Sequence, residues 1–219
     1  MDRWKGKWAL ITGASAGIGK ALAQQLAAGG ANLVLTARRK DRLEQLAADL
    51  RTRNGVAVGT FPADLAQPGA PDSLFAYTQG KGIAIELLAN NAGFGAYGKF
   101  EEMPLRRQLD MVQVNISAVI HLTHLYLPQM IARRHGDVLI VASTAGFQAV
   151  PYITTYAATK SFDLFFAEAL AEEMRPYGVR VCALCPGATE TEFQDVAAQP
   201  DYAFRSAETA DKEIGRAHV

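Results

Sequence analysis

A tyrosine and a lysine four positions apart are the residues in this sequence best suited to chemistry. On a helix, Tyr156 and Lys160 would share one face, with Cβ atoms about 5–6 Å apart. A free phenol titrates at about pH 10, and an ammonium group beside it stabilises the phenolate. The pair could therefore act as an acid and base near neutral pH. Taken alone, the same spacing is also typical of a surface pair on an amphipathic helix.

Two polar residues upstream could complete such a centre. Ser143 follows an apolar run, and Asn115 lies within a long helical pattern. A serine hydroxyl can donate a hydrogen bond to an oxygen on which negative charge develops during a reaction. By itself, Ser143 could equally be the cap of a strand, and Asn115 a satisfied polar residue of a helix.

A glycine-rich turn lies near the start of the chain. Residues 12–19 read Thr-Gly-Ala-Ser-Ala-Gly-Ile-Gly, after an apolar run and before a helical pattern. Such a turn lets the backbone approach a pyrophosphate, whose charge is favoured by the helix N-terminus. The glycine spacing differs from G-x-G-x-x-G, so the motif alone is weak evidence and could mark a merely tight turn.

The elements that must position these residues alternate between short apolar runs and helical patterns. Strands are expected at 8–12, 33–37, 56–61, 86–89, 137–142 and 179–184, and helices at 20–28, 41–53, 71–78, 105–134 and 154–176. The strands are continuously apolar, which indicates that both faces of the sheet are covered. The pattern predicts an α/β fold, a Rossmann-like, doubly wound parallel sheet in three α/β/α layers. The length suits a single domain, expected over residues 1–212.

The charge balance argues against several classes of partner. Lysine plus arginine equals aspartate plus glutamate, so the formal net charge is zero and nothing recruits nucleic acid or an anionic membrane. The most apolar long stretch, 111–132, contains Asn115, two histidines and Pro128, which favours a buried helix over a membrane span. We expect a soluble, cytoplasmic protein that binds a small molecule.

Neither the cysteines nor the histidines indicate a metal site. Cys182 and Cys185 lie in an apolar strand pattern and lack a second ligand pair, so we interpret them as core cysteines in a reducing compartment. His121 and His124 share a helix face but have no evident third ligand. A helix–helix interface explains these histidines better than a metal.

Taken together, the motifs resemble those of the short-chain dehydrogenase/reductase family, in its ordinary rather than its extended branch. The T-G-x-x-x-G-I-G turn is complete at 12–19, N-N-A-G stands at 90–93, Y-x-x-x-K at 156–160 and P-G at 186–187. The family's serine and helix asparagine correspond to Ser143 and Asn115. The motifs span residues 12–191 in the family's order and spacing.

The resemblance implies an oxidoreductase that transfers a hydride between NADPH and a carbonyl or alcohol. In the family, the residue corresponding to Tyr156 is the general acid/base, and the one corresponding to Ser143 holds the substrate oxygen. Lys160 would also bind the nicotinamide ribose, and Asn115 would hold a water that links Lys160 to solvent. The cofactor contacts that the resemblance implies are Gly13, Ser15, Gly17, Ile18, Gly19, Arg38, Asp64, Leu65, Asn91, Ala92, Gly93, Tyr156, Lys160, Pro186, Gly187, Thr189 and Thr191, with no metal. Thr189 stands where the family has valine or isoleucine.

The end of the second expected strand predicts NADP rather than NAD. An acidic residue there binds the ribose 2′-hydroxyl, whereas an arginine accommodates a 2′-phosphate. Here the strand runs into Arg38, and the first carboxylate is Asp41. The family's second basic position is Ala16, so the preference need not be absolute. The alternative is that this basic segment only begins the next helix.

The expected pocket walls are mostly apolar and aromatic. They comprise 94–97, 147–152 and 188–204, with no arginine or lysine before Arg205. This composition favours a hydrophobic ketone, aldehyde or secondary alcohol over a polyanion, and 3-oxoacyl thioesters fit as well. The resemblance also implies a homodimer or homotetramer built through the two long helices.

The last seven residues depart from the family. Residues 213–219 read Glu-Ile-Gly-Arg-Ala-His-Val, which matches the in-frame translation of a common sequencing-library adapter. We expect this tail to be non-native and the natural protein to continue differently after Lys212. Sequencing the source gene past this point would test that expectation.

Two other functions fit the sequence less well than an oxidoreductase does. A non-catalytic NADP-binding regulator would be expected to lack the Tyr156–Lys160 pair. An epimerase or dehydratase of the extended branch would show T-G-x-x-G-x-x-G and a longer substrate domain. No sequence feature supports a structural or nucleic-acid-binding role.

Overall fold

The computed structural model describes residues 2–187 together with 189, 192 and 197. In this part of the chain, six parallel strands form one sheet in the order β3-β2-β1-β4-β5-β6. The strands are β1 (Trp8–Thr12), β2 (Asn32–Ala37), β3 (Val58–Pro62), β4 (Ile85–Asn90), β5 (Gly136–Val141) and β6 (Val179–Leu184). The strand order reverses at β1, between β2 and β4, which is where ligands bind in doubly wound folds. This confirms the predicted Rossmann-like sheet.

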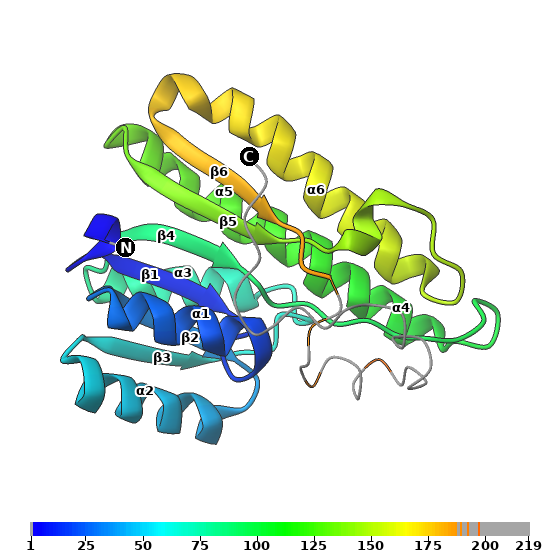
Figure 1. Ribbon diagram of the computed structural model, residues 1–219, viewed down its shortest axis with the longest axis horizontal. Helices are drawn as coiled ribbons and strands as arrows, with labels where there is room; N and C mark the ends of the chain where they lie inside the picture. Colours follow the sequence, from blue (N-terminus) through cyan, green and yellow to red (C-terminus); the bar gives the residue numbers. More distant parts are fainter. Residues whose placement is uncertain (1, 188, 190–191, 193–196, 198–219) are drawn as a thin grey trace.

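Helices cover both faces of the sheet. They are α1 (Gly17–Ala28), α2 (Lys40–Asn54), α3 (Ala70–Gly80), α4 (Leu105–Val112), α5 (Ala118–Ala132) and α6 (Thr154–Met174). One buried cluster joins α1 and α2 to one face, and a second joins α3, α5 and α6 to the other (Figure 1). All strand arrows in Figure 1 point toward the side on which α4 lies, so the carboxyl ends of the strands share one edge.

The edge strands are less buried than the sequence predicts. In β6, Arg180 is exposed and Cys182 is half-buried, while Val179, Val181 and Ala183 belong to the buried cluster of α5 and α6. The expectation of continuous burial therefore holds for the central strands only. Cys182 and Cys185 are free and half-buried, and Cys185 packs against the buried cluster of α5 and α6, so the interpretation as core cysteines holds only in part.

The predicted long helix 105–134 is interrupted. A π-helical segment, Gln113–Ser117, separates α4 from α5 and contains Asn115. Gly136 begins β5, and a Cβ on it would lie 2.5 Å from Cγ of Met130. The left-handed residue after α5 is Arg134 (φ 53°). Because π-helical turns are rare and occur frequently at functional sites, this one draws attention to Asn115.

Two histidines of α5 have structural surroundings. Nε2 of His121 lies 3.1 Å from Oδ1 of Asp72 and links α5 to α3, whereas His124 is exposed. The described residues contain no group of three metal-ligating side chains. In the same residues, no helix is long and apolar enough to cross a membrane.

Candidate active site

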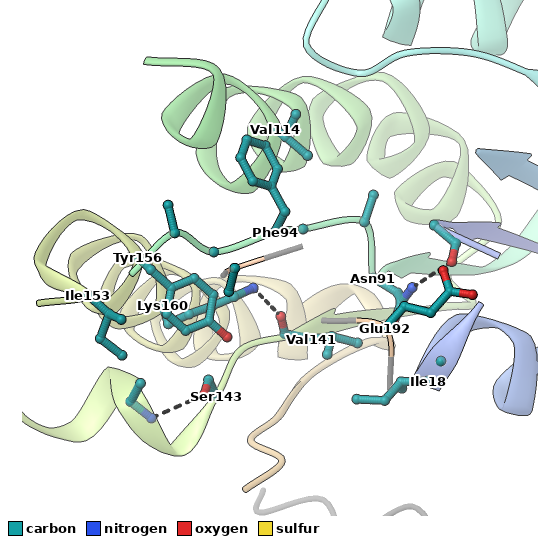
Figure 2. Close-up of a pocket in the computed structure, with 18 of the residues that line it drawn as sticks. Ile18, Asn91, Phe94, Val114, Val141, Ser143, Ile153, Tyr156, Lys160 and Glu192 are labelled. Carbon is teal, nitrogen blue, oxygen red and sulfur yellow. Dashed lines mark hydrogen bonds between the residues drawn. The ribbon is translucent and has the colours of Figure 1, made fainter. Parts of the chain in front are cut away.

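A cavity of ≈ 1170 Å³ opens at the carboxyl ends of the strands. Its lining includes the glycine-rich turn, the ends of β2 and β4, the segment after β5, and α6. In Figure 2, Tyr156 and Ser143 lie toward one end of the labelled residues, and Ile18 and Glu192 lie toward the other. The cavity is large enough for a dinucleotide and a substrate together, since typical ligand pockets measure about 300–1,000 Å³.

The glycine-rich turn has a backbone that only glycine adopts readily. Gly13 and Gly17 have φ values of +66° and +52°. A Cβ on Gly13 would also lie 2.9 Å from Cα of Ala92. The turn leads directly into α1, whose N-cap residue, Ala16, makes no side-chain cap. Uncapped N–H groups at a helix N-terminus favour an anionic ligand.

The turn is fastened to the segment after β4 by Thr12 and Asn91. The Thr12 hydroxyl accepts hydrogen bonds from the backbone N–H of Asn91 (2.9 Å) and of Ala92 (2.8 Å). The Asn91 amide donates to the Thr12 carbonyl at 2.7 Å. Gly19 packs beneath this contact, because a Cβ on it would lie 2.4 Å from Nδ2 of Asn91. Gly19 serves close packing here, and the cofactor contact that the resemblance implies for it stays a prediction.

The basic residues after β2 already bind an anionic group. Nη1 of Arg39 lies 2.6 Å from a carboxylate oxygen of Glu192, and Arg42 binds the other oxygen. Arg39 also donates weakly to the Ser15 hydroxyl, at 3.3 Å from Nη2. The hydrogen bonds from Arg42 and then Arg39 hold the pKa of Glu192 below its ordinary value. Arg38, which the sequence favoured, lines the same end of the cavity, but no contact of its side chain with Glu192 is seen.

The predicted acid/base pair lies on one face of α6. Nζ of Lys160 lies 6.0 Å from the centre of the Tyr156 ring. The ammonium donates to the Val141 carbonyl (2.7 Å) and to Oδ2 of Asp163 (2.8 Å). Figure 2 shows Tyr156 and Lys160 beside Val141, with Ser143 nearby.

Ser143 is set opposite α6 by the short 3-10 helix Thr144–Phe147. Its hydroxyl accepts a hydrogen bond from the backbone N–H of Ala145 at 3.1 Å, which leaves its own proton available to donate. Ser161 of α6 donates to the carbonyl of Gly146 at 2.8 Å. A Cβ on Gly146 would lie 2.7 Å from the Lys160 carbonyl oxygen. This close packing fixes the spacing between Ser143 and the Tyr156–Lys160 pair.

Asn115 is fully buried and its amide is used structurally. Nδ2 donates to the carbonyl of Phe94 (3.0 Å) and to the hydroxyl of Thr159 (3.0 Å), and Oδ1 accepts from the Phe94 N–H (3.2 Å). The side chain therefore joins the segment after β4 to α6. A Cβ on Gly93 would lie 3.3 Å from Oδ1 of Asn115 and 3.5 Å from Nζ of Lys160. The water that the resemblance implies at Asn115 stays a prediction.

Most other predicted cofactor contacts also line the cavity. These are Gly13, Ser15, Gly17, Ile18, Asp64, Leu65, Asn91, Ala92, Gly93, Pro186, Gly187 and Thr189. Asp64 is exposed and accepts a hydrogen bond from the Ala66 N–H, whereas Leu65 is mostly buried in the core. Thr191 lies outside the described residues.

The substrate end of the cavity is less uniformly apolar than the sequence suggested. Phe94, Tyr97 and Tyr152 line it as expected, but α4 adds Arg106 and Arg107. Nε of Arg106 pairs with Asp110 of the same helix at 2.8 Å. The expectation of walls without cations before Arg205 is therefore wrong.

One wall residue has an unusual backbone. Tyr152 has φ +67°, which is rare for a bulky side chain. Its carbonyl accepts from the Gly98 N–H at 2.8 Å, and its ring lies 5.7 Å from that of Tyr97. Such strained positions concentrate at ligand sites, where the surrounding structure maintains them.

Four residues that contribute to the site were not predicted from the sequence. Arg39 and Arg42 were passed over because only the first residue after β2 was expected to read the cofactor. Thr12 was noted only as a letter of the motif. Asp163 lies three positions after Lys160, so the helical spacing that linked Tyr156 to Lys160 could also have revealed it.

Comparison with known proteins agrees with this arrangement. The family model for short chain dehydrogenase matches residues 7–201. The very-long-chain 3-oxoacyl-CoA reductase of Pyrenophora tritici-repentis is 38% identical over 181 residues, which cover 81% of this chain and 53% of the fungal protein. The 7beta-hydroxysteroid dehydrogenase of Collinsella aerofaciens is 35% identical, covering 85% of this chain and 70% of that protein. The chain thus spans about half the length of the fungal relative it matches.

A solved structure is similar over nearly the whole chain. The short-chain dehydrogenase from Sphingobium yanoikuyae in complex with NADPH is 33% identical, with a TM-score of 0.88, and the match covers 94% of this chain and 80% of that one. The residues that the family model matches include the glycine-rich turn, the serine after β5 and the Tyr156–Lys160 pair. The chain belongs to the short-chain dehydrogenase family.

Proposed function

We propose that this protein is an NADP-dependent oxidoreductase that transfers a hydride between NADPH and a hydrophobic ketone, aldehyde, 3-oxoacyl compound or secondary alcohol. The observation that carries the proposal is a single cavity that joins an anion-binding end to the Tyr156–Ser143 end. A binding protein would need only the first end. The second end supplies a proton donor and a hydroxyl at the position of a reacting oxygen.

The residues around the first end fit a dinucleotide phosphate. Gly13, Ser15 and Gly17 of the turn line the cavity, and Arg39 and Arg42 bind the Glu192 carboxylate beside Ser15. That carboxylate can stand in for a phosphate because both anions present two oxygens that accept paired hydrogen bonds from guanidinium groups. We assign the 2′-phosphate of NADP to Arg39 and Arg42, with Arg38 beside them. The NADPH complex of the Sphingobium yanoikuyae protein supports this choice of cofactor.

The chain's own residues would manage the oxygen and its proton. The bound cofactor supplies the hydride. The Ser143 hydroxyl donates to the carbonyl oxygen and holds it near the Tyr156 hydroxyl, which gives its proton as negative charge develops there. Lys160 stabilises the phenolate that remains, because its ammonium is held near the ring by Val141 and Asp163.

The substrate end favours a bulky, largely apolar compound. Its aromatic residues Phe94, Tyr97 and Tyr152 provide apolar area, and Arg106 and Arg107 of α4 provide positive charge at the same wall. An acyl chain or a ring system with an anionic end suits both features. The names of the relatives, a 3-oxoacyl-CoA reductase and a hydroxysteroid dehydrogenase, agree with that class.

We further propose that the protein forms a homo-oligomer and that it is located in the cytoplasm. Large apolar side chains are exposed on α4 and α6, namely Leu105, Leu109 and Phe165. A second copy that packs against these helices would remove them from water. Both cysteines are free thiols, which fits a reducing compartment.

Thermal-shift titrations with NADPH and with NADH test the proposal. A ligand that binds only the folded state raises the melting temperature with the logarithm of its concentration over Kd. We expect a larger shift with NADPH than with NADH, followed by NADPH-dependent reduction of bulky ketones. A cooperative melt that neither cofactor shifts would refute the oxidoreductase assignment.

A further inference from the structure

Beneath the Tyr156–Lys160 pair lies a buried carboxylate whose only part in the mechanism above is to help hold the Lys160 ammonium. Asp163 is 1% exposed, and Lys160 is 5% exposed. Oδ2 of Asp163 lies 2.8 Å from Nζ of Lys160, one helical turn further along α6. Its other oxygen, Oδ1, is buried without a hydrogen-bond partner among the described residues. Because this carboxylate is removed from water, its negative charge acts strongly on the charged groups beside it.

The position of the ammonium is set by two acceptors. An ammonium group has three donors, and the contacts of Nζ use one on the Val141 carbonyl and one on Asp163. The two acceptors come from β5 and from α6, so they fix Nζ between strand and helix. One donor remains for the cavity, which Lys160 lines.

The carboxylate also changes the field of the ammonium. Opposite charges 2.8 Å apart partly cancel at a third group several ångströms away. The described titratable groups around Nζ are Tyr156 and Asp163 on α6 and the thiol of Cys185 after β6. The π-helical segment and the turn after β5 contribute the neutral residues Asn115 and Ser143. Asp163 is therefore the only carboxylate among these neighbours.

We propose that Asp163 is a positioning residue for Lys160 that clamps the ammonium against the Val141 carbonyl and weakens the positive field at the Tyr156 hydroxyl. This inference rests on the proposed oxidoreductase function. Asp163 touches no reacting atom and acts through Lys160. Burial raises the pKa of the Asp163 carboxyl, and the charge and hydrogen bond of Lys160 oppose that rise.

The substitution Asp163→Asn separates charge from shape. The amide keeps an oxygen that can accept from Nζ, but it removes the negative charge. We expect the midpoint of the pH profile of kcat/KM for NADP-dependent alcohol oxidation to move down by about one pH unit, because the phenolate then faces an uncompensated ammonium. Asp137→Asn is the matched control, since it removes another buried, cation-paired carboxylate and should leave that midpoint unchanged.

A second measurement does not depend on turnover. The near-ultraviolet phenolate absorbance is titrated for the wild type and for Asp163→Asn, each minus its Tyr156→Phe counterpart, so that only Tyr156 contributes. The same downward shift is expected. If Asp163→Asn does not fold, Asp163→Ser provides a smaller neutral side chain for both measurements.

The outcomes separate this inference from the proposed function. Failure of the wild type to oxidise or reduce any substrate would count against the function, while the phenolate titration would still decide the role of Asp163. A midpoint that stays unchanged, or that rises, in a folded neutral variant would overturn the inference and leave Asp163 with a structural role only.

Discussion

Buried charges lie at both the amino and the carboxyl ends of the strands, and those at the carboxyl ends lie beside the cavity. At the amino ends of the strands, Asp137 of β5 is 4% exposed and accepts hydrogen bonds from Arg3, Trp4 and Arg180. Nearby, Glu86 of β4 is bound by His135 at 2.6 Å. These groups tie the start of the chain and the edge strand β6 to the sheet.

At the carboxyl ends, the same kind of pair lies at the wall of the cavity. Lys160 and Asp163 are as deeply buried as Asp137, yet Lys160 also lines the space between Tyr156 and Gly93. Burial and charge pairing alone therefore do not distinguish a reactive site from a structural one. The site at the carboxyl ends differs because it keeps hydrogen-bond donors that a ligand can use. These donors lie in the same cavity as the glycine-rich turn.

Removing Lys160 should have the largest effect. Lys160→Met should lower kcat/KM by about a thousandfold, because it removes the charge that stabilises the phenolate. It should also lower the free energy of unfolding by about 3 kcal/mol, since Asp163 is left as an unpaired buried carboxylate. Activity assays and denaturant unfolding measure the two effects.

The double variant Lys160→Met with Asp163→Leu is the control for this prediction. It removes both charges, so stability should return while activity stays lost. Recovery of activity in the double variant would contradict the assigned role of Lys160.

A substitution of Asp137, at the amino ends of the strands, should lower stability without lowering activity. Asp137→Asn should lower the free energy of unfolding by about 2 kcal/mol at pH 7 and leave kcat/KM unchanged. The loss is smaller than for a fully buried pair because the guanidinium of Arg180 is largely exposed. A drop in kcat/KM as large as that of Lys160→Met would erase the distinction between the two edges.

The same carboxylate predicts a pH dependence of stability. Burial acts to raise the pKa of Asp137, but the hydrogen bonds from Arg3, Arg180 and Trp4 outweigh it and hold the pKa below its ordinary value. A lowered carboxyl pKa stabilises the fold above the ordinary carboxyl range, and that contribution disappears as the pH falls through the folded-state pKa. The stability gap between wild type and Asp137→Asn should therefore close below about pH 4. A gap that stays constant down to acid unfolding would contradict this assignment.

The anion-binding end of the cavity should show a moderate, cofactor-specific effect. Arg39→Ala combined with Arg42→Ala should raise the Kd for NADPH about tenfold and change the Kd for NADH little, because only NADPH carries the 2′-phosphate. Arg38→Ala provides the comparison. If Arg38→Ala alone produces the selective loss, the phosphate contact belongs to Arg38, as the sequence first suggested.

The smallest expected effect is at Glu192. Glu192→Gln should lower the Kd for NADPH by about two- to threefold, since exposed ion pairs contribute little. The change should vanish for NADH. Fluorescence titration with each cofactor measures it, and a weaker affinity for NADPH would contradict a competing role of this carboxylate.

Much of the fold, and of the site at the carboxyl ends of the strands, could be predicted from the sequence. The apolar runs predicted the six strands, and the parallel sheet brings their carboxyl ends to one edge, so Ser143 and the glycine-rich turn had to meet there. The interruption at Asn115 could not be predicted, because 105–134 reads as a continuous helical pattern and the π-helical turn depends on packing against Phe94 and Thr159. The Asp137 cluster was also missed, since its partners Arg3 and Arg180 are far apart in the chain.

The central claim is tested most directly by removing the phenolic oxygen of Tyr156, which lines the cavity, and separately that of Tyr126, which is buried in the core. Tyr126 is 1% exposed and its hydroxyl lies 2.9 Å from that of Thr78, with burial raising its pKa to about 12. The measurement is kcat for NADPH-dependent reduction of a bulky ketone, together with the melting temperature, for Tyr156→Phe and Tyr126→Phe. The account predicts at least about a hundredfold loss of kcat with an unchanged melting temperature for Tyr156→Phe, and a lowered melting temperature with unchanged kcat for Tyr126→Phe. A folded Tyr156→Phe variant that retained the wild-type kcat would contradict it.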